Sequence, residues 1–212
     1  SVPCTPWPAS VLPSEFSNVR TVTFESSDLD RQNYFHYMGT APIRYVVSDE
    51  APRYELSALP GAKPTITIDG ETARVRFVVP DDIRSRYVQP SLTLYGPALT
   101  ALTADGARSH IMYTAKDQPS LQVTTTKSGA SVGVTGGAIA QLMVHGTGSA
   151  DVGGASVGEL NVMAEQGLVV TAGTVRTLTI MQPDVCPAGE SKSKATGVYV
   201  ESVTSGKITY NG

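Results

Sequence analysis

The chain has 212 residues, with 16 basic and 19 acidic side chains and a formal net charge of −3 at pH 7. A nucleic-acid-binding protein normally carries a basic patch, and this balance offers no obvious one. No apolar run approaches the roughly 18 residues that a membrane-spanning helix needs. We therefore expect neither a nucleic-acid partner nor a transmembrane segment.

The composition favours β-structure with a substantial core. Hydrophobic residues make up 41% of the chain, too many for a disordered protein. Val, Thr and Ile supply 24, 23 and 8 residues, about a quarter of the chain, and β-branched side chains suit a pleated strand better than a helix. No segment keeps a 3.6-residue apolar period over ten residues. These features predict an all-β fold.

In chain order, a Pro-rich arm comes first and short strand-like runs follow it. Residues 1–16 contain four prolines and the single tryptophan, Trp7, which we expect to pack the arm down. Alternating apolar and polar runs predict strands at residues 19–24, 43–47, 65–68 and 73–79. The dipeptide Asp69-Gly70 predicts a hairpin turn between the last two of these strands.

An internal repeat of 18 residues is the most informative feature of the second half. The blocks 131–148, 149–166 and 167–184 align without a gap. Four apolar columns recur at equal block positions. They are Val134, Val152 and Val170; Ile139, Val157 and Val175; Leu142, Leu160 and Leu178; and Val144, Val162 and Ile180.

Stacking explains this pattern physically. One coil cannot bury its apolar face alone, whereas a second coil about 4.8 Å away pairs the backbones and lines up the columns. Glycines at 136–137 and 153–154 permit tight bends. The pattern predicts a β-solenoid, similar to a single-stranded β-helix, with about 18 residues per coil in the C-terminal half. The four columns would form its core ladder, and less regular strands would precede it. An ordinary β-sandwich with evenly spaced hairpins is the alternative.

The predicted organisation is one domain after the arm. We expect residues 17–212 to form a single domain that is irregular at 17–90 and repetitive at 91–182. An insertion at 183–195 and closing strands at 196–212 complete it.

The two cysteines, Cys4 and Cys186, lie in Pro-rich loops near opposite ends of the chain. Their separation does not fit a metal site or a C-x-x-C redox pair. We favour a disulfide that pins the arm to a late loop, as in proteins of oxidising compartments. Two free thiols are the alternative, and lipid modification of Cys4 is a further one.

The start of the chain also bears on location. It lacks an initiator Met, as an exported protein would after removal of its signal, although a start chosen within a longer chain would look the same. We expect an extracellular, cell-surface or periplasmic protein.

Several runs resemble the head GIN domain family of auto-transporter adhesins. They are the entry Phe16-Ser17-Asn18-Val19, residues 75–80, residues 92–100, the Gly-rich Leu-x-Val repeats and the closing residues 205–212. The resemblance implies an exported bacterial β-helical domain with an adhesive role, and it carries no catalytic residues. The insertion at 183–195 and the long segment 28–38 depart from the family pattern.

The histidines give little support for a metal site. His36, His110 and His145 lie far apart, and neither His-x-His nor His-x-x-x-His spacing occurs. His145 aligns with two methionines of the repeat, which favours a packing position.

A hydrolase site is equally weak in the sequence. Ser109 and His110 have Asp105 and Asp117 nearby, but the Gly-x-Ser-x-Gly turn that exposes a serine nucleophile is absent. We assign no catalytic residue.

Acidic side chains could hold Ca²⁺ or cleave a polysaccharide. Clusters at residues 25–30 and 80–82 have the right ligands for Ca²⁺, but polar loop and turn-capping roles are the simpler interpretation. A Gly/Asp run at 146–151 occurs only once. The repeats carry few acids, and none suggests two carboxylates within catalytic reach: Asp151, Glu159, Glu165 and Asp184. No metal or cofactor residue is assigned.

The hypothesis is a non-enzymatic exported protein that acts in adhesion or protein–protein contact. Its partners would be other proteins or surface glycans, and no cofactor is expected. One alternative is a self-assembling structural subunit, as a homo-oligomer or polymer. Another is a β-helix protein that binds or cleaves polysaccharide.

Overall fold

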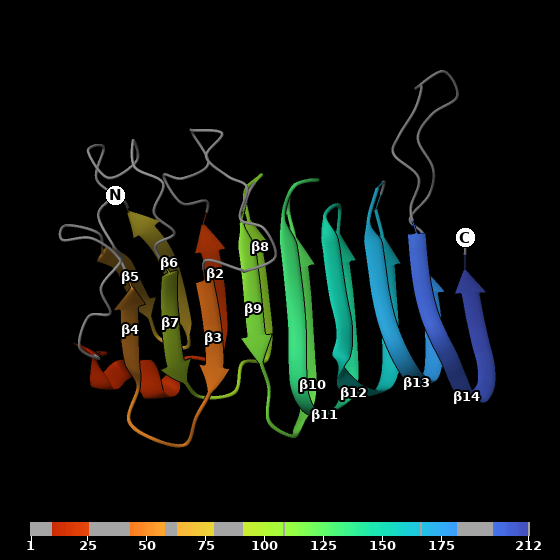
Figure 1. Cartoon of the computed structure of the whole chain (residues 1–212), viewed down its shortest axis with the longest axis horizontal. Helices are drawn as coiled ribbons and strands as arrows, with labels where there is room; N and C mark the ends of the chain where they lie inside the picture. Colours follow the sequence, from red (N-terminus) through yellow and green to blue (C-terminus); the bar gives the residue numbers. More distant parts are fainter. Residues whose placement is uncertain are drawn as a thin grey trace.

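The computed structural model describes residues 10–25, 43–57, 63–78, 91–107, 109–165, 167–181 and 197–211. Within these residues the protein is all-β, as the composition predicts, and its strands form one 14-stranded sheet (Figure 1). The strands are β1 (Ser10–Val11), β2 (Thr21–Glu25), β3 (Ile43–Val47), β4 (Arg53–Ser57), β5 (Lys63–Asp69), β6 (Thr72–Val78), β7 (Ser91–Gly96), β8 (Ala101–Asp105), β9 (His110–Thr114), β10 (Gln118–Thr125), β11 (Ser131–Gly146), β12 (Ser149–Ala164), β13 (Val169–Met181) and β14 (Gly197–Asn211). A short 3-10 helix, η1 (Ser14–Asn18), follows β1.

Alternation of side chains places the core on one face of the sheet. In β7, β8 and β9 every second residue is buried and its neighbours are half-buried. Successive side chains of a strand point to opposite faces, so this period of two turns the aliphatic residues inward and leaves Thr and Ser outward. No helix in the described part of the chain is long and apolar enough to cross a membrane.

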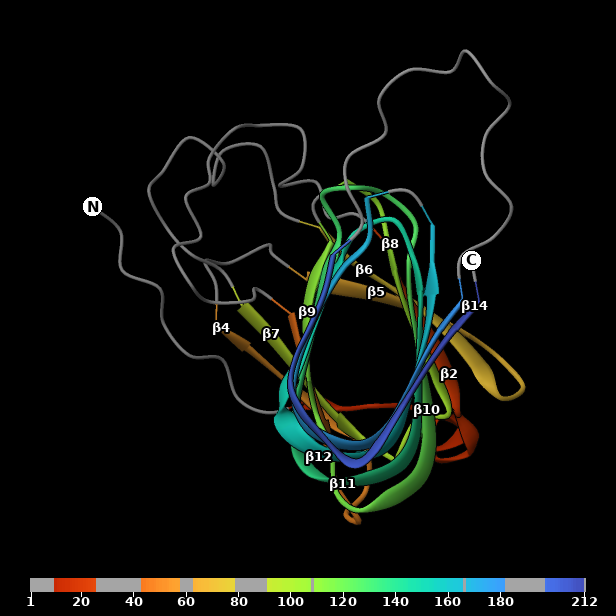
Figure 2. The ribbon, with the colours of Figure 1, turned by 90° about the vertical axis from the view of Figure 1, so that its right-hand side faces the viewer.

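The sheet curls because its long strands bend. The first part of β11 pairs in parallel with β9, and its second part pairs in parallel with β10. Gly136 and Gly137 lie between the two parts with φ of 72° and 64°, a conformation that favours glycine. Viewed along the long axis, the strands wrap around a common interior (Figure 2). Each long strand therefore contributes one arm to each of two facing walls.

Consecutive long strands stack in parallel with related residues opposite one another. Three of the four predicted columns lie in the predicted register. The pairs are Ile139 with Val157 and Val157 with Val175, Leu142 with Leu160 and Leu160 with Leu178, and Val144 with Val162 and Val162 with Ile180. All nine are buried except Ile180, which is half-buried against the core. These pairs repeat every 18 residues.

The fourth column does not keep the predicted register. Its members Val134, Val152 and Val170 are all fully buried, but Val170 pairs with Ala150 instead of Val152. Two residues separate β11 from β12, whereas four separate β12 from β13. The longer connection buries Leu168 completely, and it moves the start of β13 by two positions. A register shift between Asp151 and Val157 restores the 18-residue spacing further along.

The strands before β9 do not follow chain order. On one wall β3 lies between β7 and β9, and on the other β2 lies between β6 and β8, all in parallel. At the end of the sheet β4 pairs antiparallel with β7 and β1, and β5 pairs antiparallel with β6. The predicted hairpin turn at Asp69-Gly70 is confirmed, with Gly70 at φ 59°.

Several expectations fall outside the described residues. They are the disulfide between Cys4 and Cys186, the packing of Trp7, the position of His36 and the insertion at 183–195.

Candidate functional site

The sequence-predicted polar residues take up structural positions in separate places. The Ser109 hydroxyl is buried and donates a hydrogen bond to the Phe24 carbonyl at 3.1 Å. Nδ1 of His110, the next residue, lies 2.6 Å from the hydroxyl of Ser131 on the neighbouring strand β11. Ser109 and His110 thus contact different partners on opposite faces of the strand.

The two aspartates of the Ser/His/Asp hypothesis also have other partners. Asp105 accepts a hydrogen bond from the Thr126 hydroxyl at 2.8 Å. Asp117 accepts one from the backbone N–H of Ala138 at 2.8 Å and so ties two successive bends together. Each of these four groups therefore has a hydrogen-bond partner outside the Ser/His/Asp set.

His145 faces outward on the second arm of β11, in the row that also contains Met163. Its Nε2 lies 2.8 Å from Oε1 of Glu165. Among the described residues no group of three or more His, Cys, Asp or Glu side chains is placed to hold a metal ion. Two of the acids that the sequence analysis considered also have structural partners. Oε1 of Glu159 lies 3.0 Å from an Arg176 guanidinium nitrogen, and Asp151 accepts a hydrogen bond from the Gly153 N–H.

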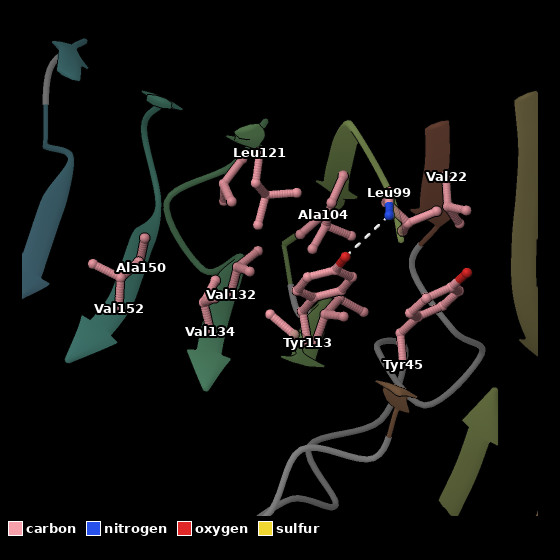
Figure 3. Packing of buried hydrophobic residues seen from close by; sticks show 14 of the residues in the cluster. Val22, Tyr45, Leu99, Ala104, Tyr113, Leu121, Val132, Val134, Ala150 and Val152 are labelled. Carbon is pink, nitrogen blue, oxygen red and sulfur yellow. Dashed lines mark hydrogen bonds between the residues drawn. The ribbon is translucent and has the colours of Figure 1, made fainter. Parts of the chain in front are cut away.

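A buried polar cluster crosses the core between β3, β9 and β10. The rings of Tyr45 and Tyr113 stack with centroids 5.6 Å apart, and both are fully buried. The Tyr113 hydroxyl accepts the Leu99 N–H at 3.0 Å (Figure 3) and donates to Oε1 of Gln118 at 2.7 Å. The Gln118 amide donates in turn to the Leu99 carbonyl at 2.8 Å. The cluster is closed on itself, so we regard it as structural.

Burial also controls the ionisation of these phenols. Removal from water raises the pKa of Tyr113 to about 12, and its hydrogen bonds with Leu99 and Gln118 offset part of that rise. The pKa of Tyr45 is raised well above its usual value, first by burial and then by the neighbouring Tyr113. Both hydroxyls are therefore neutral donors at physiological pH.

A shallow groove runs along the bends of three neighbouring segments of the sheet, and we call it the bend groove. Its volume is about 530 Å³. It is lined by Asp117, Gln118, Pro119, Ala138, Ile139, Ala140, Ser156, Val157 and Gly158. Two of its segments approach closely at Gly158, where an added Cβ would lie 2.6 Å from the Ala140 carbonyl oxygen.

A polar row borders the bend groove on the second wall. Gln141, Glu159 and Thr177 lie opposite one another in β11, β12 and β13. Gln141 Nε2 lies 3.4 Å from a Glu159 carboxylate oxygen, and Arg176 binds the other oxygen at 3.0 Å. Together the bend groove and this row offer an apolar floor beside a charged, hydrogen-bonding border.

Sequence reasoning did not anticipate either the tyrosine cluster or the bend groove. The tyrosines stand 68 positions apart in sequence, in strands that meet only through the interleaved order of the sheet. The groove had one local signal, which was the alignment of small residues near the bends of the repeat.

The sequence comparisons identify no relative. No family model matches the chain, and no curated protein matches it. The resemblance to the head GIN domain family therefore stays a prediction.

Solved structures do match over the whole length. A "putative lipid binding protein" from Parabacteroides distasonis is 11% identical, with a TM-score of 0.54, over 98% of this chain and 97% of that one. A "putative adhesin" from Bacteroides fragilis is 10% identical, with a TM-score of 0.51, over 99% of this chain and 98% of that one. At such identities the likeness concerns the fold, which this chain shares with both proteins from end to end.

Proposed function

We propose that this chain is an exported, non-enzymatic β-solenoid that acts in adhesion, at a cell surface or outside the cell. The fold is shared over the full length with a protein described as an adhesin, which favours a domain of the same kind. Fold alone does not specify function. The choice of adhesion therefore depends on the surface that the stacked coils present.

The parallel stacking of β11 to β14 supports the solenoid assignment. Residues such as Leu142, Leu160 and Leu178 recur at the same place on consecutive strands. A stack of this kind builds extended surfaces by repetition, and repeat proteins commonly bind partners on such surfaces.

The bend groove with its polar row is the observation that carries the proposal. Three coils contribute to one exposed depression, so its shape depends on the stack as a whole. No aromatic ring lies among the lining residues, whereas sugar-binding sites commonly use aromatic faces. An apolar floor with a charged border suits a protein segment, with Glu159 and Arg176 as polar anchors at its edge. We therefore favour a protein partner over a glycan.

Binding to immobilised proteins and glycans tests the proposal. We expect the labelled chain to bind a subset of extracellular proteins, and the substitution Ala140→Trp, which fills the groove, to weaken that binding about tenfold or more. Ala107→Trp is the matched control, because Ala107 is exposed in a turn away from the groove and the same bulk is added there. Circular dichroism and thermal unfolding establish that both variants fold.

Other outcomes would contradict the proposal. Binding to glycans or lipid vesicles alone would replace the protein partner, and equal loss in both tryptophan variants would remove the groove from the binding surface. Turnover of an acidic polysaccharide would overturn the non-enzymatic assignment.

A further inference from the structure

Strand β14 is the last strand that the structure describes, and it has a single partner strand among the described residues. It pairs in parallel with β13 along residues 197–203 and again along 207–211, with an irregularity between them, and no other strand in the described part of the chain pairs with it. Figures 1 and 2 show it as the terminal coil, bent in the same way as the coils behind it. The strand is 15 residues long, and none of the described strands pairs with its outer edge, so that edge is a template for another strand.

The same strand also exposes apolar side chains that continue the core columns. Ile208 lies opposite Leu178 in the central column, yet it is 62% exposed because no coil covers it. Tyr210, opposite Ile180, is 61% exposed, whereas Tyr199, which is 63% exposed, lies on the outer face opposite the exposed Thr171. Three of the five large exposed hydrophobic residues in the described chain thus belong to this one strand.

At the opposite end of the stack, which we call the closed end, the two described edge strands carry features that discourage strand addition. Edge strand β5 has Pro64 near its start, and a proline discourages further pairing. The other edge, β1, is two residues long, and η1 next to it buries Phe16 completely. Among the described edge strands, β14 is the one best suited to strand addition, so we favour a closed dimer over a head-to-tail polymer.

The sequence of β14 is complementary to itself in one antiparallel register. With a two-fold axis at Thr204, Glu201 of one copy faces Lys207 of the other, and both side chains are exposed. The same register places Val200 opposite Ile208 of the second copy. Val200 and Ile208 both point to the interior in the single chain, being opposite Ala172 and Leu178. In this register the opposite charges of Glu201 and Lys207 face each other on the outer surface, and Val200 and Ile208 face each other in the interior.

The bent shape of the strand suits this arrangement. A two-fold axis through the bend carries the first arm of one copy onto the second arm of the other and reverses the strand direction. Each arm then gains an antiparallel partner, and the two cores join end to end.

We propose that two copies of this chain associate through β14, edge to edge, as a closed two-fold dimer. The Glu201–Lys207 pair, formed twice, selects the register. The dimer is independent of the adhesion proposal, because the bend groove lies on the side of the coils and remains exposed.

Sedimentation of the full chain over a range of concentrations tests the proposal. We expect a monomer–dimer equilibrium without larger species. Glu201→Lys and Lys207→Glu should each weaken the dimer about tenfold, because like charges would then face one another across both pairs. The double variant Glu201→Lys/Lys207→Glu should restore it. Glu71→Lys is the control, since it makes the same charge change in the hairpin turn at the closed end.

Restoration by the double variant is decisive, because a folding defect would not be repaired by a second reversal. A chain that stays monomeric at every concentration would overturn the proposal. This is the result expected if another segment of the same chain covers the edge of β14. A dimer that ignores the charge reversals, or growth beyond two copies, would also overturn it.

Discussion

The hydroxyl of Tyr113 on β9 donates a 2.7 Å hydrogen bond to Oε1 of Gln118, the first residue of β10. The same hydroxyl accepts the Leu99 N–H at 3.0 Å, from the connection between β7 and β8. One buried phenol on β9 therefore links the β7–β8 connection to β10, and it satisfies polar groups that would otherwise be buried without partners.

Removing this hydroxyl should destabilise the fold. Tyr113→Phe keeps the ring but leaves the Leu99 N–H and the Gln118 carbonyl oxygen without this partner, which costs about 1–3 kcal/mol. Urea denaturation should show that loss in the free energy of unfolding. Tyr199→Phe is the matched control, because Tyr199 is 63% exposed and its hydroxyl can remain in water. Equal effects for the two variants would contradict a structural role for the buried cluster.

Stability should fall in alkaline solution. The pKa of Tyr113 is about 12 in the fold, against about 10 for an unperturbed tyrosine, and burial is the main cause. Above pH 10 the unfolded chain loses this proton while the folded chain retains it, so unfolding is favoured as the pH rises. Each such tyrosine contributes a decrease of about 1.4 kcal/mol per pH unit between the two pKa values. Tyr45, whose pKa is raised in the same direction, adds a second contribution.

Denaturation curves between pH 8 and about 12, with tyrosinate absorbance measured in parallel, test this dependence. Tyr113→Phe should reduce the alkaline slope without removing it, since Tyr45 remains. A slope unchanged by that substitution would show that other groups control alkaline unfolding.

Glycine at the bend of β11 should be required for close approach as well as for backbone conformation. A Cβ on Gly137 would lie 2.5 Å from the Lys116 carbonyl carbon and oxygen. Gly70 has a similar φ of 59°, but nothing lies within 4 Å of its Cβ position. Gly70→Ala should therefore cost only the left-handed backbone strain, about 1–2 kcal/mol. Gly137→Ala should cost more than Gly70→Ala in thermal or urea unfolding, and an equal cost would mean that the coils part easily at the bend.

The central column should be sensitive to cavities. Leu160 is fully buried between Leu142 and Leu178, so Leu160→Ala should lower the free energy of unfolding by about 2–5 kcal/mol. Asn161→Ala, one residue along and facing outward, should change it by less than about 0.5 kcal/mol. Similar effects at both positions would mean that this column does not form the core of the stack.

Local patterns in the sequence were enough to predict strand-forming segments and much of their register. Residues 43–47 alternate in character, and they form β3 at those bounds. The Asp69-Gly70 turn and the alignment of Leu142 with Leu160 follow from short-range rules and from the 18-residue repeat. These features depend on contacts that recur at a fixed distance along the chain, so one sequence contains the information.

Only the tertiary structure decided the interleaved order of the early strands, the position of Val170 and the bend groove. β3 enters between β7 and β9 because its side chains fill that place in the core, a contact between segments far apart in sequence. Val170 lies opposite Ala150 because the connection before it buries Leu168. The 18-residue period of the sequence does not indicate which of these side chains is buried. Competition among distant residues for the same buried space is settled only when the whole chain is packed.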